Sequence, residues 1–88
     1  GFTRAVALET AGHGITVNAV APGWIASGSQ LQFEQVAGAL TPIGRSGTPD
    51  EIAAAVRFLA DRSASYITGQ LVVVDGGNSL PEDRSWRP

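Results

Sequence analysis

The 88-residue sequence contains no cysteine and no methionine. The absence of cysteine excludes disulfide bonds, thiolate metal sites and a cysteine nucleophile, and it is compatible with a reducing cytosol. There is no initiator methionine, and Gly1-Phe2 leads into a helical pattern without a capping residue before it. We therefore expect the chain to begin inside a longer protein.

The sequence also lacks a cluster of basic residues and a long apolar run. Its formal net charge is −2 at pH 7, and without a basic patch neither nucleic acid nor an anionic membrane surface is an expected partner. No stretch approaches the roughly 20 apolar residues of a membrane-spanning helix, and none has the pattern of a signal peptide. We expect a soluble, cytoplasmic protein.

The first half of the sequence contains one helix and one strand. Phe2–Ala11 is rich in helix-forming residues and is followed by the glycine stop Gly12-His13-Gly14. Its apolar residues lie on more than one face, which implies a second packing partner. Ile15–Ala21 has the composition of a strand, and we expect Pro22-Gly23 to end it.

The second half begins with a loop that has weak helical character around Gln32–Leu40. The clearest local signal is the capping box of Thr48 and Glu51, which predicts a helix running to about Ala60. The β-branched run Leu71–Val74 lies between glycines and predicts a strand buried on both faces.

Two strands joined through a helix are expected to pair in parallel. A parallel sheet needs helices on both faces, and two strands with two main helices cannot provide them. The predicted fold class is therefore α/β, as the C-terminal part of a Rossmann-like, doubly wound parallel sheet. We assign residues 1–77 to that part of a single domain and residues 78–88 to an irregular tail.

Several polar or aromatic residues have plain structural interpretations. His13 stands alone between two glycines, which favours an exposed turn over a metal or catalytic role, and we expect no metal site. Asp50 and Glu51 suit the start of a helix, and Asp75 is suited to fixing the turn after the last strand. Trp86, in the tail, is either disordered or an anchor on a neighbouring subunit.

Four ordered blocks carry a family resemblance: the stretch ITVNAVAPGWIAS (Ile15–Ser27), the helix start GTPDEIA, the tripeptide FLA and the stretch ITGQLVVVDGG (Ile67–Gly77). In this order and spacing the chain resembles the last third of a short-chain dehydrogenase/reductase. The resemblance implies the C-terminal segment of an NAD(P)-dependent oxidoreductase that interconverts a carbonyl and an alcohol or reduces an acyl thioester.

The resemblance also implies roles for individual residues. Pro22 and Gly23 would face the nicotinamide, the backbone of Ile25 would address the carboxamide, and Ser27 stands where the family usually has threonine. The following stretch, 28–41, would be the mobile substrate loop, with Gly28 at its start. Trp24 is open to two interpretations, packing and substrate lining. The cofactor is NAD or NADP, because the residue that distinguishes them lies outside this sequence.

The family's catalytic tyrosine is followed four positions later by a lysine, whose charge lowers the pKa of the tyrosine. This sequence has no lysine, and Tyr66 is followed four positions later by Gln70. We interpret Tyr66 as a packing residue and expect the catalytic pair upstream of Gly1. The glycine-rich phosphate loop is absent as well, so the 88 residues alone are expected to be inactive.

Other hypotheses remain open from the sequence. The same fold unit could be a non-catalytic assembly or binding module, and the chain could also belong to an unrelated parallel α/β protein. As an enzyme, it is expected to be a homodimer or homotetramer. Its substrate is undetermined, since the motifs resemble enoyl-CoA reductase and terpenoid-alcohol dehydrogenase relatives as well as 3-oxoacyl-carrier-protein reductases.

Overall fold

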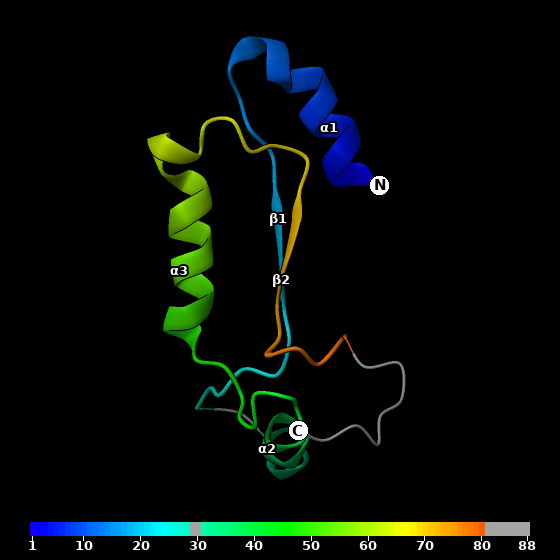
Figure 1. Cartoon of the computed structure of the whole chain (residues 1–88), viewed down its shortest axis with the longest axis vertical. Helices are drawn as coiled ribbons and strands as arrows, with labels where there is room; N and C mark the ends of the chain where they lie inside the picture. Colours follow the sequence, from blue (N-terminus) through cyan, green and yellow to red (C-terminus); the bar gives the residue numbers. More distant parts are fainter. Residues whose placement is uncertain (29–30, 81–88) are drawn as a thin grey trace.

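A computed structural model describes residues 1–28 and 31–80 of the chain. Within these residues the order of elements is helix, strand, two helices and strand, with a short 3-10 turn after the first and last helices (Figure 1). Their bounds are α1 Phe2–Thr10, η1 Ala11–His13, β1 Ala19–Pro22, α2 Gln32–Ala39, α3 Pro49–Ala60, η2 Arg62–Ala64 and β2 Leu71–Val74.

The two strands form a parallel sheet, as predicted, with a register running from Ala19 opposite Leu71 to Pro22 opposite Val74. Helix α3 contacts both strands. Figure 1 shows α3 running alongside the sheet, α1 near the amino ends of the strands and α2 beyond their carboxyl ends. The chain thus builds one face of a layered α/β structure.

The first strand is shorter and lies later than predicted. We expected a strand over Ile15–Ala21, but β1 spans Ala19–Pro22 and includes the proline as its last residue. Just before the strand, the Asn18 side chain adds to the backbone bond that the Gly69 amide donates to the Val17 carbonyl over 2.8 Å. It donates to the Ile67 carbonyl over 3.1 Å and accepts from the Gln70 amide over 3.0 Å.

The helices follow the sequence signals closely. Helix α1 ends at Thr10 rather than at Ala11, and the 3-10 turn that follows stops at Gly14, whose φ of 74° lies in the left-handed region. The weak pattern around Gln32–Leu40 forms a full helix, α2. The third helix starts and ends where its capping box and apolar stripe predicted.

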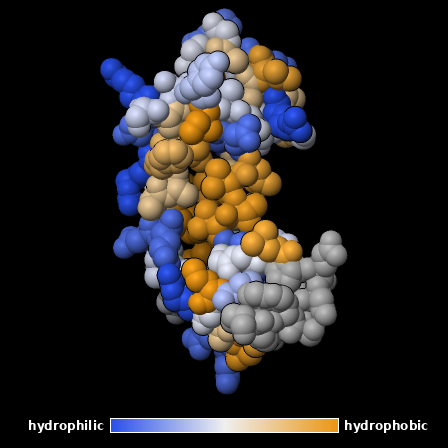
Figure 2. Space-filling view, viewed as in Figure 1, coloured by the Kyte–Doolittle hydropathy of each residue, from blue (hydrophilic) through white to orange (hydrophobic). Residues whose placement is uncertain are grey.

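Among the described residues, the sheet is covered on one face only. The prediction that Leu71–Val74 is buried on both faces is wrong for this chain, because Leu71 is 63% and Val73 is 48% exposed. Both point away from the side where α3 packs, and alternate residues of β2 are half-buried. Figure 2 shows the resulting apolar surface as an orange area over the middle of the molecule.

Tyr66 is fully exposed, at 101% of its reference surface, so its interpretation as a packing residue is wrong. It follows the turn η2 and precedes β2, where none of the described elements covers it. After β2 the chain continues in turns, in which the Asn78 amide donates a hydrogen bond to the Asp75 carbonyl and the Leu80 amide donates one to the Gly77 carbonyl. The remainder of the predicted tail, including Trp86, lies outside the described residues.

None of the described helices has the length and apolar character needed to cross a membrane.

Candidate functional site

The carboxyl ends of the two strands meet at one edge of the sheet. The Gly23 amide donates to the Val74 carbonyl over 3.0 Å and so extends the ladder by one bond beyond β1. In open parallel sheets, ligands bind outside this edge. The two turns that leave β1 and β2 are therefore the part of the fold where a site is expected.

Gly23 allows these two turns to touch. A Cβ atom at this position would lie 2.7 Å from Asp75 Cβ and 2.9 Å from Asp75 Cα, closer than real Cβ contacts come. The backbone of the β1 turn thus packs directly on Asp75, the residue that follows β2. Only glycine fits this approach without a shift of the backbone.

Asp75 fixes the turn after β2, as predicted. Its two carboxylate oxygens accept from the Gly77 amide over 3.0 Å and from the Ser79 amide over 2.9 Å. Partial burial alone would raise the pKa of Asp75, but the hydrogen bonds from Ser79 and Gly77 together outweigh it and lower the pKa. The ionised side chain therefore holds one wall of the site.

The turn after β1 is held on its other side by the segment before α3. The Gly47 amide donates to the Trp24 carbonyl over 2.8 Å, and the Ala26 amide donates to the Gly47 carbonyl over 2.7 Å. These bonds form an isolated parallel bridge between Ile25 and Gly47. Ile25 is consequently half-buried between two fixed neighbours.

Trp24 connects the turn to α2. Its ring lies edge-on to that of Phe33, with the ring centroids 6.5 Å apart and the planes at 85°. This geometry is a favourable one for an aromatic pair. Trp24 is half-buried and Phe33 is 63% exposed. The pair therefore packs Trp24 against α2 and leaves the Phe33 ring largely exposed.

An ion pair between Arg45 and Glu51 attaches the segment 45–48 to the first turn of α3. Arg45 donates from Nη1 and Nη2 to the two carboxylate oxygens of Glu51, over 2.8 and 2.9 Å. Glu51 also accepts from the Thr48 amide over 2.9 Å, and the Thr48 hydroxyl accepts from the Glu51 amide over 3.2 Å. The predicted capping box is confirmed.

The same contacts set the charge state of Glu51. The side-chain hydrogen bond from Arg45, and after it the bond from the Thr48 amide, lower the pKa of Glu51 from 4.5 to about 2. The Arg45 pKa is raised by the same hydrogen bond and by the charge of Glu51. Both groups are charged at neutral pH.

Thr41 is a buried polar residue behind this ion pair, at 6% exposure. Its hydroxyl lies 2.8 Å from the Gly38 carbonyl and 3.2 Å from the Arg45 carbonyl, and it accepts from the Gly44 amide over 3.3 Å. One side chain thus joins the end of α2 to the backbone that carries Arg45.

A small cavity of about 130 Å³ lies among these elements. It is lined by both turns and by the start of α3, through Trp24, Ile43, Arg45, Gly47, Glu51, Val74, Asp75 and Gly76. The lining combines an aromatic ring, two carboxylates and a guanidinium group.

The structure places the residues named from the sequence along one continuous turn. Gly23, Trp24 and Ile25 are half-buried against neighbouring elements, whereas Pro22 is exposed at the end of β1. Further along, Ser27 and Gly28 are exposed. Residues 29 and 30 of the predicted substrate loop lie outside the described residues.

Sequence reasoning did not identify Arg45, Thr41 or Gly47 as parts of this site. Arg45 and Glu51 are six residues apart and separated by an irregular turn, so neither the helical nor the strand spacing rule pairs them. The signal that could have led to Arg45 is the capping residue Glu51, because a carboxylate that caps a helix with one oxygen can bind a cation with the other.

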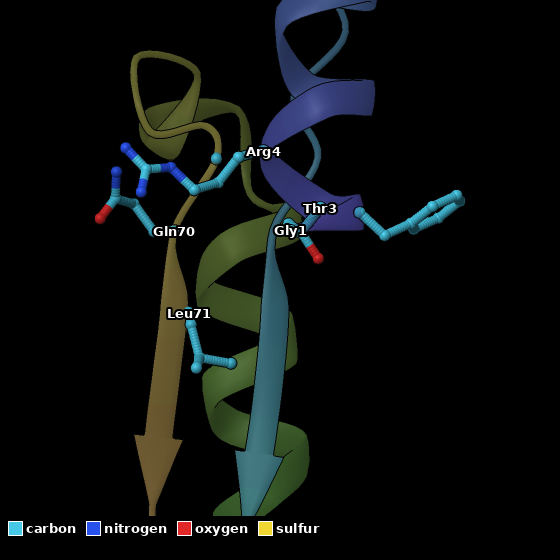
Figure 3. A pocket seen from close by; sticks show the side chains of 7 residues that line it. Gly1, Thr3, Arg4, Gln70 and Leu71 are labelled. Atoms are coloured by element: carbon cyan, nitrogen blue, oxygen red, sulfur yellow. The ribbon is translucent and has the colours of Figure 1, made fainter.

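A larger hollow, of about 630 Å³, lies at the opposite end of the strands (Figure 3). It is formed where the start of α1 meets the start of β2, and Figure 3 shows the Arg4 side chain extending over β2 near Gln70. This is the amino end of the sheet, where ligands do not usually bind in open α/β folds. We assign no site to it.

Among residues 1–28 and 31–80, no three histidine, cysteine, aspartate or glutamate side chains group in a way that could hold a metal ion.

Comparison with known proteins gives the same family repeatedly. A family profile described as "Enoyl-(Acyl carrier protein) reductase" matches residues 1–79. The chain is 48% identical over 85 residues to galactitol 2-dehydrogenase (L-tagatose-forming) from Cereibacter sphaeroides, covering 90% of this chain and 34% of the relative. It is 51% identical over 80 residues to a 3-oxoacyl-(acyl-carrier-protein) reductase from Synechocystis sp., covering 88% and 32%.

Solved structures agree with the sequence matches. A mutant short-chain dehydrogenase/reductase from Serratia marcescens superposes with a TM-score of 0.82 at 36% identity, over 91% of this chain and 34% of the other. The chain spans about a third of the length of the curated relatives it matches. The fold is thus the expected part of a Rossmann-like sheet, and the chain belongs to the short-chain dehydrogenase/reductase family.

Proposed function

We propose that the chain is the C-terminal third of an NAD(P)-dependent oxidoreductase that interconverts a carbonyl and an alcohol or reduces an acyl thioester. The observation that carries this is the contact between Gly23 and Asp75, which brings two parallel strands to a common edge with a preformed turn beyond it. Residues 1–77 belong to the catalytic domain in this proposal, and residues 78–88 form a tail.

The turn supplies contacts to the nicotinamide end of the cofactor. Pro22 and Gly23 form the surface that faces the ring, the backbone of Ile25 holds the carboxamide, and the Ser27 hydroxyl provides a further hydrogen bond. The dinucleotide, when bound, accepts or supplies the hydride. The residues of this chain bind and orient it, while the proton-relay tyrosine and lysine lie elsewhere in the enzyme.

The segment 28–41 forms the substrate side of the site, with Gly28 exposed at its start, and Trp24 lines it together with Phe33. Their edge-on packing supports this role because it fixes an apolar wall directly after the cofactor turn. One relative named above is a galactitol 2-dehydrogenase and the other a 3-oxoacyl-(acyl-carrier-protein) reductase. Both substrate classes fit the proposal, as do both NAD and NADP.

The bare apolar face of the sheet and the exposed apolar residues of α1, Phe2 and Leu8, support a further role in assembly. We therefore propose that the full-length protein is a homodimer or homotetramer in the cytoplasm.

The test is a calorimetric titration of the full-length protein with NAD⁺ and NADP⁺, followed by steady-state kinetics on a Ser27→Ala variant. Loss of one hydrogen bond to the cofactor is expected to weaken dinucleotide binding about three- to tenfold. The matched control is Ser65→Ala, an exposed serine at the end of η2 on the far side of the fold.

A Michaelis constant for the dinucleotide and a turnover that both stay unchanged in Ser27→Ala would contradict the role of this hydroxyl. A full-length protein that binds neither dinucleotide, yet associates through the apolar face, would instead be a non-catalytic assembly module.

A further inference from the structure

We propose that Arg45 and Glu51 are positioning residues for the dinucleotide: their ion pair holds Gly47 against the Trp24–Ala26 turn and thereby fixes the backbone of Ile25. The inference rests on the proposed function, because it assigns a second layer of support to the same cofactor turn.

The first step is the bridge between the turn and Gly47. Two backbone hydrogen bonds, of 2.8 and 2.7 Å, join Gly47 to Trp24 and Ala26 on either side of Ile25. The side chain of Ile25 also packs at this point, since a Cβ on Gly47 would lie 3.1 Å from Ile25 Cδ1. Any displacement of Gly47 therefore moves the backbone of Ile25.

The second step is the attachment of Gly47 to α3. Arg45 lies two residues before Gly47 and Thr48 directly follows it, and both bind the same carboxylate of Glu51. Arg45 Nη1 in addition donates to the Ser46 carbonyl over 3.0 Å. The residues on both sides of Gly47 are thus fixed to the first turn of a twelve-residue helix that contacts both strands.

The third step is the planar geometry of the ion pair. A two-pronged guanidinium–carboxylate contact defines orientation as well as distance, which a single ammonium cannot do. The Thr41 hydroxyl lies within hydrogen-bond distance of the Arg45 carbonyl, so the backbone of Arg45 is restrained from behind. The arrangement therefore transmits the position of α3 to the cofactor turn.

The side chains of Arg45 and Glu51 are 54% and 44% exposed. Exposed ion pairs contribute little to global stability, because water and salt screen them and ordering two long side chains has an entropic cost. A variant of Arg45 is consequently expected to fold normally and to change the local geometry of the turn. This separates a positioning role from a purely structural one.

The experiment uses the full-length protein with Arg45→Met, Arg45→Lys and, as a matched control, Arg57→Met on the last turn of α3. Arg45→Met removes the charge but leaves the Thr48–Glu51 capping box in place. Arg45→Lys keeps the charge without the two-pronged contact. For each protein the dinucleotide KM, kcat, calorimetric dinucleotide affinity and thermal midpoint are measured.

The expected result is a dinucleotide KM raised about three- to tenfold in Arg45→Met, as for loss of uniform binding. Arg45→Lys is expected to be intermediate and Arg57→Met unchanged, with kcat and the thermal midpoints of all variants close to wild type. An unchanged dinucleotide KM in Arg45→Met overturns the inference. So does a loss of kcat that accompanies a large fall in thermal midpoint, because the pair would then serve only the fold.

Failure of the proposed function gives a different result, since the wild-type protein itself would then show no dinucleotide binding. Normal binding by wild type with identical binding by Arg45→Met refutes the positioning role alone.

Discussion

The absence of a side chain at Gly23 determines how closely the two strand ends approach. The space that a methyl group would need is occupied by the Cα and Cβ atoms of Asp75, which belong to a turn fixed by its own carboxylate. Gly23 therefore has a packing role in addition to the cofactor contact proposed for it.

At this scale we predict that Gly23→Ala destabilises the full-length protein by about 1–3 kcal/mol, the usual cost of forcing a methyl group into a filled space. Urea unfolding measures the change. The control is Gly12→Ala, because a Cβ at Gly12 meets nothing within 4 Å, and its effect is expected to stay within about 0.5 kcal/mol. Equal stabilities for the two variants would contradict the close packing of the strand ends.

At the scale of elements, the start of α3 combines a helix cap with an ion pair on one carboxylate. Glu51 has a pKa of about 2 in the folded chain, against an ordinary value of 4.5, chiefly because Arg45 and the Thr48 amide bind its ionised form. A lowered pKa means that this contribution to stability, which solvent screening keeps small, is complete above about pH 4.5 and is lost as the pH falls toward 2.

We accordingly predict that the difference in thermal midpoint between wild type and Glu51→Gln is constant above about pH 5 and narrows between pH 4.5 and 2. The measurement is a series of thermal melts of the full-length proteins across this range. Glu34→Gln, on α2, is the control for removing a carboxylate elsewhere. A difference that widens on acidification would show that the ionised form of Glu51 is not the stabilising one.

Elements with strong local signals could be predicted from the sequence. Thr48 and Glu51 defined the start of α3, and the β-branched run defined β2. The start of β1 could not be predicted, because the pairing before it mixes backbone hydrogen bonds with bonds of the Asn18 side chain, which local propensity does not specify. The burial of Tyr66 was predicted wrongly, because whether a residue is covered depends on which other elements pack over it, and the local sequence pattern does not specify them.

The candidate site likewise has residues that could be predicted from the sequence and residues that could not. The turn from Pro22 to Ser27 was recognisable because its motif is continuous in sequence. Arg45 and Gly47 contribute through contacts across an irregular segment, and Thr41 through burial. Contacts of this kind depend on tertiary packing, so the sequence indicates the residues that touch the cofactor in the proposal more readily than those that hold them.

At the scale of the whole molecule, the chain exposes apolar surface on the sheet and on α1 (Figure 2). Leu71, Val73, Phe2 and Leu8 are all at least 48% exposed, so the described fold leaves much of its apolar surface in water. Such surface is normally covered by further layers or by another subunit.

We predict that the isolated 88-residue chain associates or aggregates and that it neither binds the dinucleotide nor turns over substrate. Analytical ultracentrifugation and thermal melting of the purified chain measure the first property, and calorimetry the second. Val73→Lys, on the bare face of β2, is expected to reduce association. A monomeric chain with a cooperative melt, or one that binds the dinucleotide, would contradict this account of the fold.

The most direct test of the central claim is a crystal structure of the full-length protein with its dinucleotide bound. The account predicts that the nicotinamide carboxamide lies within hydrogen-bonding distance of the Ile25 backbone, beside the Pro22-Gly23 turn. A nicotinamide bound away from this turn would contradict it.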